Sequence, residues 1–259
     1  MKGVILAGGK GTRLFPMTSV TNKHLVPVGN LPMIEYPLHT LLKMGINDIC
    51  VVTGGEHFQD IAAYLSHMHP NLNFSYHYQR EAGGIAQALY LVAPSVGNEK
   101  MAVILGDNVF NGDFSEPAER FKHSNLGSMV FLKEVQDPQR FGVPLIEDGK
   151  IVNTVEKPKS PPSNFAITGL YFYDSTVFDK ISNLKPSARG EYEITDVINK
   201  YITEGGLNHH IIDGFWSDAG TIESRKKCSE FVNIGLEKEI LKSLLENPHV
   251  AEILKRSFD

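Results

Sequence analysis

The chain has 259 residues, of which 42% are hydrophobic and 21% charged, enough apolar material for one large core with or without an appendage. Its 25 Lys and Arg against 30 Asp and Glu leave a net charge of −5, which argues against a nucleic-acid-binding protein. No apolar stretch approaches the ~18 residues of a membrane span, and the start lacks the apolar region of a signal peptide, so we expect no membrane partner.

The first predicted element is a buried strand that ends in a glycine-rich, cationic loop. An apolar run over residues 3–7 stops at the sequence GGKGTR of residues 8–13. Glycine has no Cβ, so the backbone N–H groups of such a loop can approach an anion closely, and Lys10 and Arg13 add positive charge. The loop therefore predicts a site for a phosphate chain, against the plainer interpretation of a turn between two elements.

Two widespread phosphate-binding patterns do not fit this loop. The P-loop needs a lysine followed by Ser or Thr at its end, and none closes this one. The dinucleotide pattern G-x-G-x-x-G fits Gly9 and Gly11, but its third glycine is Leu14 here. Pro16 also disfavours a long helix directly after the loop.

The first 110 residues alternate short apolar runs with longer periodic stretches, which predicts a doubly wound nucleotide-binding half. Strands are expected at residues 3–7, 48–53, 73–78 and 101–105, and helices at residues 33–44, 59–66 and 85–92. Cys50 lies in one of these strands and Cys228 in a later helical stretch. Two cysteines so placed form no disulfide framework, so we expect Cys50 to be a core residue and the protein to be cytoplasmic.

The pattern changes after residue 110 and predicts a second, substrate-facing half. We expect strands at residues 128–135, 142–147, 150–156 and 166–173, a helix at 193–204, and a last strand near 209–212. Residues 221–259 are strongly helical, with segments at 222–235 and 236–256 interrupted near Asn247-Pro248. Apolar positions in this tail are expected to pack on the core or on another subunit: Phe231, Ile234, Leu236, Ile240, Leu241, Leu244, Leu245, Ile253 and Leu254.

Two aspartates are the candidates for a metal site. Asp107 directly follows the buried strand at 101–105, where ligands of open α/β sheets gather, and Asp218 lies in a turn context. Two carboxylates suffice for Mg²⁺, which also takes water and substrate phosphates. Read alone, Asp107 has a turn residue or a helix cap as the alternative, and for Asp218 the plainer interpretation is the more frequent one.

Four cations are spread along the chain: Arg13, Lys23, Lys157 and Arg189. Any one of them, taken alone, is more typical of a solvated surface. Their meaning depends on a resemblance to known proteins.

The amino-terminal blocks resemble the sugar nucleotidyltransferases. The loop matches G-G-x-G-T-R-L-x-P-x-T through residues 8–18, and residues 22–34 resemble the second block of that family. Co-linear likeness extends over about residues 1–220, and within the family it is greatest to the thymidylyltransferases that act on glucose 1-phosphate. Departures occur at Gly83, Pro144, Tyr192 and residues 217–219, and Gly83 leaves the choice between dTTP and UTP open.

The resemblance implies an α/β fold, with a Rossmann-like, mostly parallel mixed sheet, helices on both faces and a helical C-terminal tail. It implies a catalytic domain at 1–220, with a nucleotide-binding half to about 110 and a sugar-phosphate-binding half after it, and a helical segment at 221–259.

The resemblance also assigns site residues. Implied catalytic residues are Arg13, Lys23, Asp107, Lys157 and Asp218, with Asp107 and Asp218 as Mg²⁺ ligands. Nucleotide binding is implied for Leu6, Ala7, Gly8, Gly9, Gly11, Thr12, Arg13, Lys23, Gln79, Gly84 and Asp107. Sugar-phosphate binding is implied for Asn108, Gly142, Glu156, Lys157, Thr168, Tyr171 and Arg189.

The implied activity is transfer of a nucleotidyl group from dTTP (or UTP) to glucose 1-phosphate, in nucleotide-sugar biosynthesis such as the route to dTDP-rhamnose. A homo-oligomer, either dimer or tetramer, is expected with it. Two alternatives stay open: a related transferase using UTP or another sugar phosphate, and a non-catalytic subunit that binds a sugar nucleotide.

Overall fold

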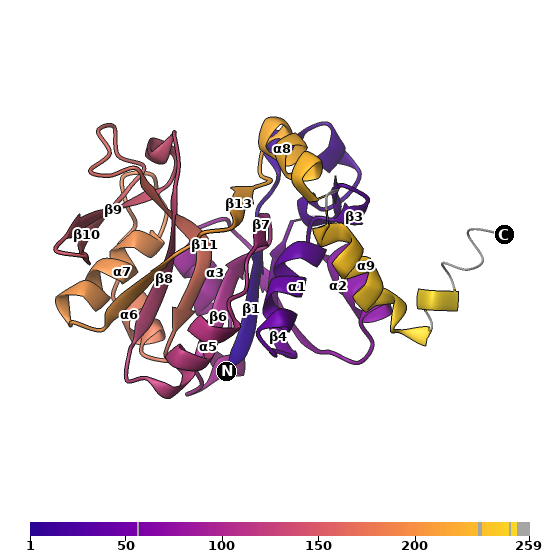
Figure 1. Ribbon diagram of the computed structural model, residues 1–259, viewed down its shortest axis with the longest axis horizontal. Coiled ribbons are helices and arrows are strands. Elements are labelled where there is room, and N and C mark those ends of the chain that lie inside the picture. Colours follow the sequence, from indigo (N-terminus) through magenta and orange to yellow (C-terminus); the bar gives the residue numbers. More distant parts are fainter. Residues whose placement is uncertain (56, 233–234, 249, 253–259) are drawn as a thin grey trace.

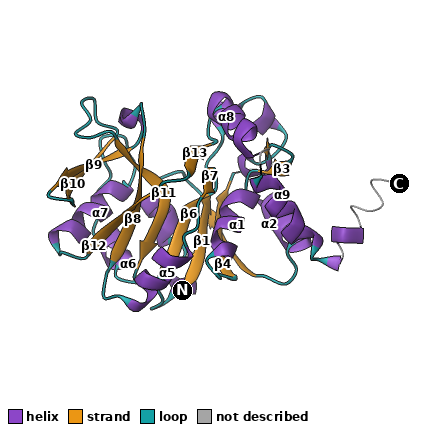
Figure 2. Cartoon of the chain, viewed as in Figure 1, coloured by secondary structure: helices purple, strands orange, loops and turns teal. Residues whose placement is uncertain are grey.

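The computed structural model describes residues 1–55, 57–232, 235–248 and 250–252, and packs helices on both faces of a mixed sheet (Figure 1, Figure 2). Its strands are β1 (Lys2–Ala7), β2 (Pro27–Val28), β3 (Leu31–Pro32), β4 (Asp48–Gly54), β5 (Asn73–Gln79), β6 (Met101–Leu105), β7 (Asn108–Asn111), β8 (Ser128–Glu134), β9 (Gly142–Glu147), β10 (Lys150–Glu156), β11 (Phe165–Tyr173), β12 (Leu207–Ile211) and β13 (Phe215–Asp218). Its α-helices are α1 (Glu35–Lys43), α2 (Phe58–Met68), α3 (Ile85–Tyr90), α4 (Ala93–Val96), α5 (Ser115–His123), α6 (Val177–Ser182), α7 (Ile194–Thr203), α8 (Ile222–Val232) and α9 (Leu236–Leu245).

The central sheet has nine strands and joins the two halves of the chain. Its main path is β10-β9-β11-β6-β1-β4-β5, with β8 pairing both β11 and β12. Strands β6, β1, β4 and β5 run parallel, whereas β11 pairs antiparallel with β6, β8 and β9. The expected Rossmann-like mixed sheet is confirmed, and it runs unbroken across the predicted boundary near residue 110.

Strand β1 is buried on both faces, which explains its continuous apolar sequence. Val4 and Leu6 face one core, against α3, α6 and α7, while Ile5 and Ala7 face the other, against α1, α2 and α5. In the parallel register Leu6 lies beside Leu105 of β6, and the Leu6 carbonyl accepts a hydrogen bond from Gly106 N–H at 2.9 Å. The glycine-rich loop and Asp107 therefore leave the sheet next to each other.

The C-terminal helices α8 and α9 cover the loop region of the amino-terminal half (Figure 1). Their apolar side chains form a third core with Leu14, Val28 and Met33. The packing expected of the tail is confirmed for Phe231, Leu236, Ile240, Leu241 and Leu244. Leu245 does not pack on the core, because it lies off the buried stripe of α9 and is 47% exposed; the alternative of packing on another subunit stays a prediction for this residue. Ile234, Ile253 and Leu254, and the predicted helical positions 253–256, lie outside the described residues.

Several short elements were not predicted from the sequence, and two of them position the candidate site. Strands β7 and β13 form a separate antiparallel pair in which Asp218 lies opposite Asn108. Asp218, expected in a turn, is thus the last residue of a strand. A four-residue strand carries too few side chains for a periodic pattern to reveal it.

Cys50 and Cys228 are both buried and unpaired, as expected from their placement. Within the ranges described above, no helix is both long enough and apolar enough to cross a membrane.

Candidate functional site

The carboxyl ends of β1 and β6 open into a cavity of about 240 Å³ that residues from both halves line. Its walls include these predicted site residues: Arg13, Asp107, Asn108, Gly142, Glu156, Lys157, Thr168, Tyr171 and Asp218. A second cavity of about 290 Å³ lies on the glycine-rich loop, and Gly9 and Lys23 line it together with Lys10. Side chains far apart in sequence therefore share one region of the surface.

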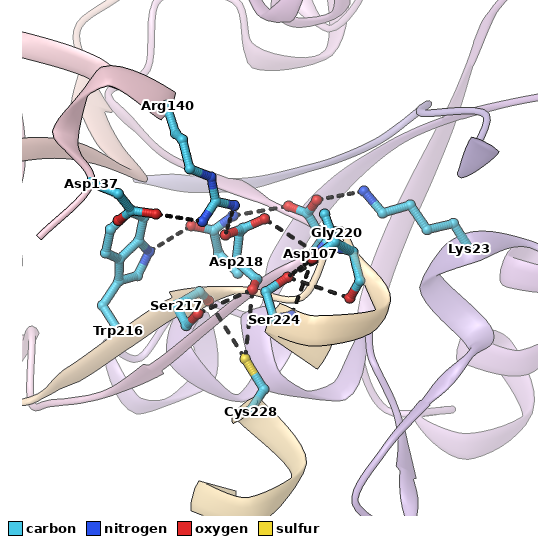
Figure 3. A network of polar contacts seen from close by, with 12 residues as sticks. Lys23, Asp107, Asp137, Arg140, Trp216, Ser217, Asp218, Gly220, Ser224 and Cys228 are labelled. Atoms are coloured by element: carbon cyan, nitrogen blue, oxygen red, sulfur yellow. Dashed lines mark hydrogen bonds and ion pairs between the residues drawn. The ribbon is translucent and has the colours of Figure 1, made fainter. Parts of the chain in front are cut away.

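The two aspartates converge around Gly220 (Figure 3). A Cβ built on Gly220 would lie 3.1 Å from Oδ2 of Asp107 and 3.1 Å from Oδ2 of Asp218, and 3.3 Å from the Arg13 guanidinium. The backbone holds this arrangement, because Ala219 N–H donates to the Asp107 carbonyl at 2.7 Å. The space between the carboxylates is open only because residue 220 has no side chain.

Asp107 is held in its ionised form. Burial would raise the pKa of its carboxyl, but Lys23 Nζ lies 2.5 Å from Oδ2 and Asn108 donates to Oδ1, so the pKa is far below its usual range. A 3-10 turn over Lys23–Leu25 carries this lysine, and Asn22 caps the turn by accepting from His24 N–H at 3.0 Å.

Asp218 is biased in the opposite direction. Burial and the neighbouring charge of Asp107 raise the pKa of Asp218, outweighing Arg140, whose guanidinium lies 3.5 Å away, and Arg13. This carboxylate therefore lacks sufficient positive charge around it, as expected for a group that gains from a bound cation.

Asn108 links several elements at the cavity through its side-chain hydrogen bonds. The resemblance implied a sugar-phosphate role for this residue and did not predict these contacts. Its Oδ1 accepts from Trp216 Nε1 at 2.7 Å and from Gly169 N–H at 3.1 Å, while its Nδ2 donates to Asp107 at 2.9 Å. The side chain is 2% exposed. It thus ties β7, β11 and β13 to the aspartate.

The glycine-rich loop is shaped by glycines at defined positions. Gly11 has φ +67°, and a Cβ there would lie 2.8 Å from side-chain carbons of Lys23 and Thr18. Thr12 and Arg13 are the exposed residues of the 3-10 turn Thr12–Leu14 that follows. Leu6 and Ala7 are buried in β1, so only their backbone is available to a ligand.

Lys157 and Glu156 form part of one wall of the first cavity, and Arg189 lies next to Glu156. Lys157 has a left-handed backbone, φ +43°, which is uncommon outside glycine and is held by a hydrogen bond from its N–H to the Phe141 carbonyl at 2.9 Å. Burial and Glu193 raise the pKa of Glu156 despite Lys157, 3.6 Å away, and Arg189, 3.5 Å away. Arg189 does not line the first cavity and also pairs with Glu191 and Glu193.

Thr168 carries a buried hydroxyl in this wall. Its Oγ1 has no hydrogen-bond partner among the described residues, although the side chain is fully buried. Tyr171, 3% exposed, lines the cavity beside it. A buried polar atom without a partner suits a ligand hydroxyl.

Gln79 and Gly84 line neither of the two cavities. Gln79, at the end of β5, is 6% exposed, and its amide oxygen lies against Gly8. Gly84 has φ +101° and caps α3, and a Cβ there would collide with the Tyr192 backbone at 2.6 Å.

Sequence reasoning assigned no role to three residues that the structure brings to the aspartates. Arg140 donates one hydrogen bond to Asp218 at 3.5 Å and another to Asp137 at 2.8 Å. Trp216 donates a hydrogen bond to Asn108 and so fixes its side chain. His24 lies next to Gly106, and burial lowers its pKa to about 3, so its ring stays neutral. The only signal in the sequence was their place beside residues already singled out.

Comparison with known proteins adds the following. A model of the family described as "Nucleotidyl transferase" matches residues 2–233. A glucose-1-phosphate thymidylyltransferase of Mycolicibacterium smegmatis is 43% identical over 239 residues, covering 90% of this chain and 82% of that protein. The low-salt glycan biosynthesis nucleotidyltransferase Agl11 of Haloferax volcanii is 36% identical, covering 93% of this chain and 68% of that protein.

Two solved structures share the fold. A crystal structure from Bacillus anthracis, described as a glucose-1-phosphate thymidylyltransferase in complex with a sucrose, has a TM-score of 0.86 and 48% identity, covering 90% of this chain and 96% of that one. A UDP-glucose pyrophosphorylase complexed with UDP-glucose has a TM-score of 0.81 at 24% identity, covering 90% of this chain and 98% of that one, and supports the fold alone.

Proposed function

This chain belongs to the nucleotidyl transferase family, and from that membership we propose that it transfers a thymidylyl group from dTTP to glucose 1-phosphate, releasing pyrophosphate. The observation that carries the proposal is the convergence of Asp107, Asp218 and Arg13 at one cavity that Glu156 and Lys157 also line. Anionic ligands from two sides can meet there.

The residues present fit a divalent cation. Asp107 and Asp218 supply carboxylate oxygens, which Mg²⁺ prefers, around a space that a side chain at position 220 would fill. When bound there, Mg²⁺ would lower the repulsion between the two phosphate groups.

The chemistry needs no strong general base, because the phosphate oxygen of glucose 1-phosphate is already an anion. That oxygen forms a bond to the α-phosphorus of dTTP, and the bond from this phosphorus to the bridging oxygen breaks, so the electron pair leaves with pyrophosphate. The protein positions the reactants and neutralises charge.

Each group of residues has a separate task in this proposal. Arg13 and Lys23 neutralise the triphosphate and the departing pyrophosphate, with backbone N–H groups of the glycine-rich loop. Lys157 and Arg189 bind the sugar phosphate, Glu156 and Thr168 bind sugar hydroxyls, and Gln79 with Gly84 binds the base. Residues 1–110 thus serve the nucleotide and 111–220 the sugar phosphate, with the C-terminal helices as support.

A pyrophosphate-release assay tests the proposal. Glucose 1-phosphate and MgCl₂ are incubated with dTTP, UTP, CTP, ATP or GTP in turn, and we expect release with dTTP that EDTA abolishes and added Mg²⁺ restores. A strong preference for UTP would replace the thymidylyl assignment, and no release with any triphosphate would favour a sugar-nucleotide-binding subunit.

We also propose that the protein is cytoplasmic and that it forms a homo-oligomer. A cytoplasmic location is supported by the two unpaired cysteines. A homo-oligomer is supported by exposed apolar side chains such as Phe15, 65% exposed, and Val20, 78% exposed, and light scattering measures it.

A further inference from the structure

Two glutamines beside the glycine-rich loop are joined by a hydrogen bond, and a backbone N–H donates to the same acceptor oxygen. Gln79 Nε2 donates to Gln87 Oε1 at 2.7 Å. The backbone N–H of Gly83 lies 3.1 Å from the same Oε1, and shares its hydrogen with the Glu81 carbonyl at 2.9 Å. Gln87 comes from α3 and Gln79 from the end of β5, so the contacts link two elements.

The backbone group fixes the orientation of both side chains. A glutamine amide can turn by half a rotation without changing shape, so its neighbours decide which atom is oxygen. The Gly83 N–H is a donor in every state, so Gln87 must present its oxygen to it. The Gln79 atom that faces this oxygen must then be the Nε2 donor, and Oε1 of Gln79 points the other way.

That oxygen points at the glycine-rich loop. A Cβ built on Gly8 would lie only 2.0 Å from Gln79 Oε1, so the amide rests directly against the loop backbone. Gln79 is 6% exposed, so its neighbours hold the side chain in place and leave only the choice of which amide atom is the oxygen. The side chain therefore offers a fixed acceptor beside the predicted nucleotide-binding loop.

Gly83 makes the close approach possible. A Cβ there would lie 2.7 Å from Cδ of Gln87 and 2.9 Å from its Oε1 and Nε2, so a larger residue would displace the amide. This gives a physical reason for glycine at one of the positions where the sequence departs from its family pattern.

We propose that Gln87 is a positioning residue for base selection: it holds Gln79 with Oε1 toward the nucleotide, so the site accepts pyrimidines that carry a ring N–H and rejects cytosine. This inference rests on the proposed function. Thymine and uracil offer an N–H at ring position 3, which Oε1 accepts, whereas cytosine has a lone pair there that would face the same oxygen. A site built around one hydrogen bond discriminates strongly against a base that leaves its buried group unpaired.

The test compares two substitutions at one position. Gln87→Met keeps the length of the side chain but removes the acceptor, so Gln79 is free to turn and the ratio of kcat/KM for dTTP over CTP should fall about tenfold, the factor expected for one neutral hydrogen bond. Gln87→Glu keeps an acceptor toward both N–H groups and should keep the ratio. Gln59→Met, at an exposed position of α2, is the matched control. Both triphosphates are measured on one preparation, so a loss of folded protein does not affect the ratio.

The outcomes distinguish the role proposed for Gln87 from the proposed function of the protein. If wild type releases pyrophosphate from dTTP and Gln87→Met keeps the wild-type ratio of kcat/KM for dTTP over CTP, the role proposed for Gln87 is wrong and the proposed function stands. If wild type is inactive with every pyrimidine triphosphate, the proposed function fails. Calorimetric Kd values for dTTP and CTP then test the role proposed for Gln87 by themselves. A smaller difference between the Kd values for dTTP and CTP in Gln87→Met than in wild type supports that role, and an unchanged difference overturns it.

Discussion

The two aspartates of the candidate site differ in electrostatic environment although they lie around one glycine. Lys23 keeps the pKa of Asp107 far below its usual range, while burial and Asp107 itself raise the pKa of Asp218. A cation bound between them would relieve the repulsion at Asp218 and compete with Lys23 for Asp107. Lys23 would then be released toward a phosphate ligand.

Replacement of Asp107 tests its proposed role most directly. Asp107→Asn keeps the shape of the side chain but removes the charge, so we expect turnover to fall by at least about a hundredfold. Pyrophosphate release measures turnover, and circular dichroism checks that the fold is kept. Asp113→Asn, at an exposed position, is the control, and wild-type turnover in Asp107→Asn would remove this residue from the mechanism.

Glu156 provides a prediction with a pH dependence. Its folded pKa is raised, chiefly by burial and also by Glu193, so its ionised form opposes folding at neutral pH and this cost disappears as pH falls through that pKa. Glu156→Gln should therefore raise the stability of the ligand-free protein at neutral pH, by up to ~1 kcal/mol, and not in acid.

Thermal unfolding at neutral and mildly acidic pH measures this difference. The exposed Glu147→Gln should leave Tm unchanged at both. An equal gain for Glu156→Gln at both pH values would contradict the electrostatic cause.

Among the elements, the strand pair β7 and β13 decides the geometry of the site. Its register places Asp218 opposite Asn108, and Asn108 in turn holds Asp107 and Trp216. The turn after β13 then brings Gly220 between the aspartates and Arg13.

Gly220→Ala tests whether that space is needed. The added methyl group would lie 3.1 Å from both carboxylates, so we expect a loss of turnover of at least about tenfold with the fold retained. The control is Gly235→Ala, where the new Cβ meets no described residue within 4 Å apart from its chain neighbours. Equal turnover in the two variants would show that the space is not used.

Helix α9 connects the C-terminal segment to the glycine-rich loop through the third core. Ile240, 2% exposed, packs in the cluster that holds Leu14, the residue after Arg13. Ile240→Ala should cost about 2–4 kcal/mol of unfolding free energy in urea. Leu245→Ala, on the same helix but 47% exposed, should cost under ~0.5 kcal/mol, and equal costs would contradict this packing.

For the whole molecule, the site depends on contacts between segments distant in sequence. Arg13 comes from the first loop, Asp107 from the middle of the chain and Asp218 from beyond the last strand of the central sheet, yet all three line one cavity. The central sheet brings Arg13 and Asp107 together, because β1 lies beside β6, and the separate pair of β7 with β13 adds Asp218.

The sequence alone determined the fold class and most of the elements. Strand β1 is a continuous apolar run because it is buried on both faces, and its abrupt end at three glycines predicted the loop. Local signals of this kind suffice where neighbouring residues dictate the structure. The resemblance supplied the site residues that composition and spacing could not.

The tertiary structure alone decided how these residues meet. The pairing of β7 with β13 and the opposite pKa shifts of Asp107 and Asp218 depend on contacts between distant segments. The orientation of the Gln79 amide depends on Gln87 and Gly83, which are near in sequence but whose contacts only the folded backbone shows. Burial and the orientation of hydrogen bonds are properties of packed neighbours, and no periodicity within one segment encodes which distant side chain will be that neighbour.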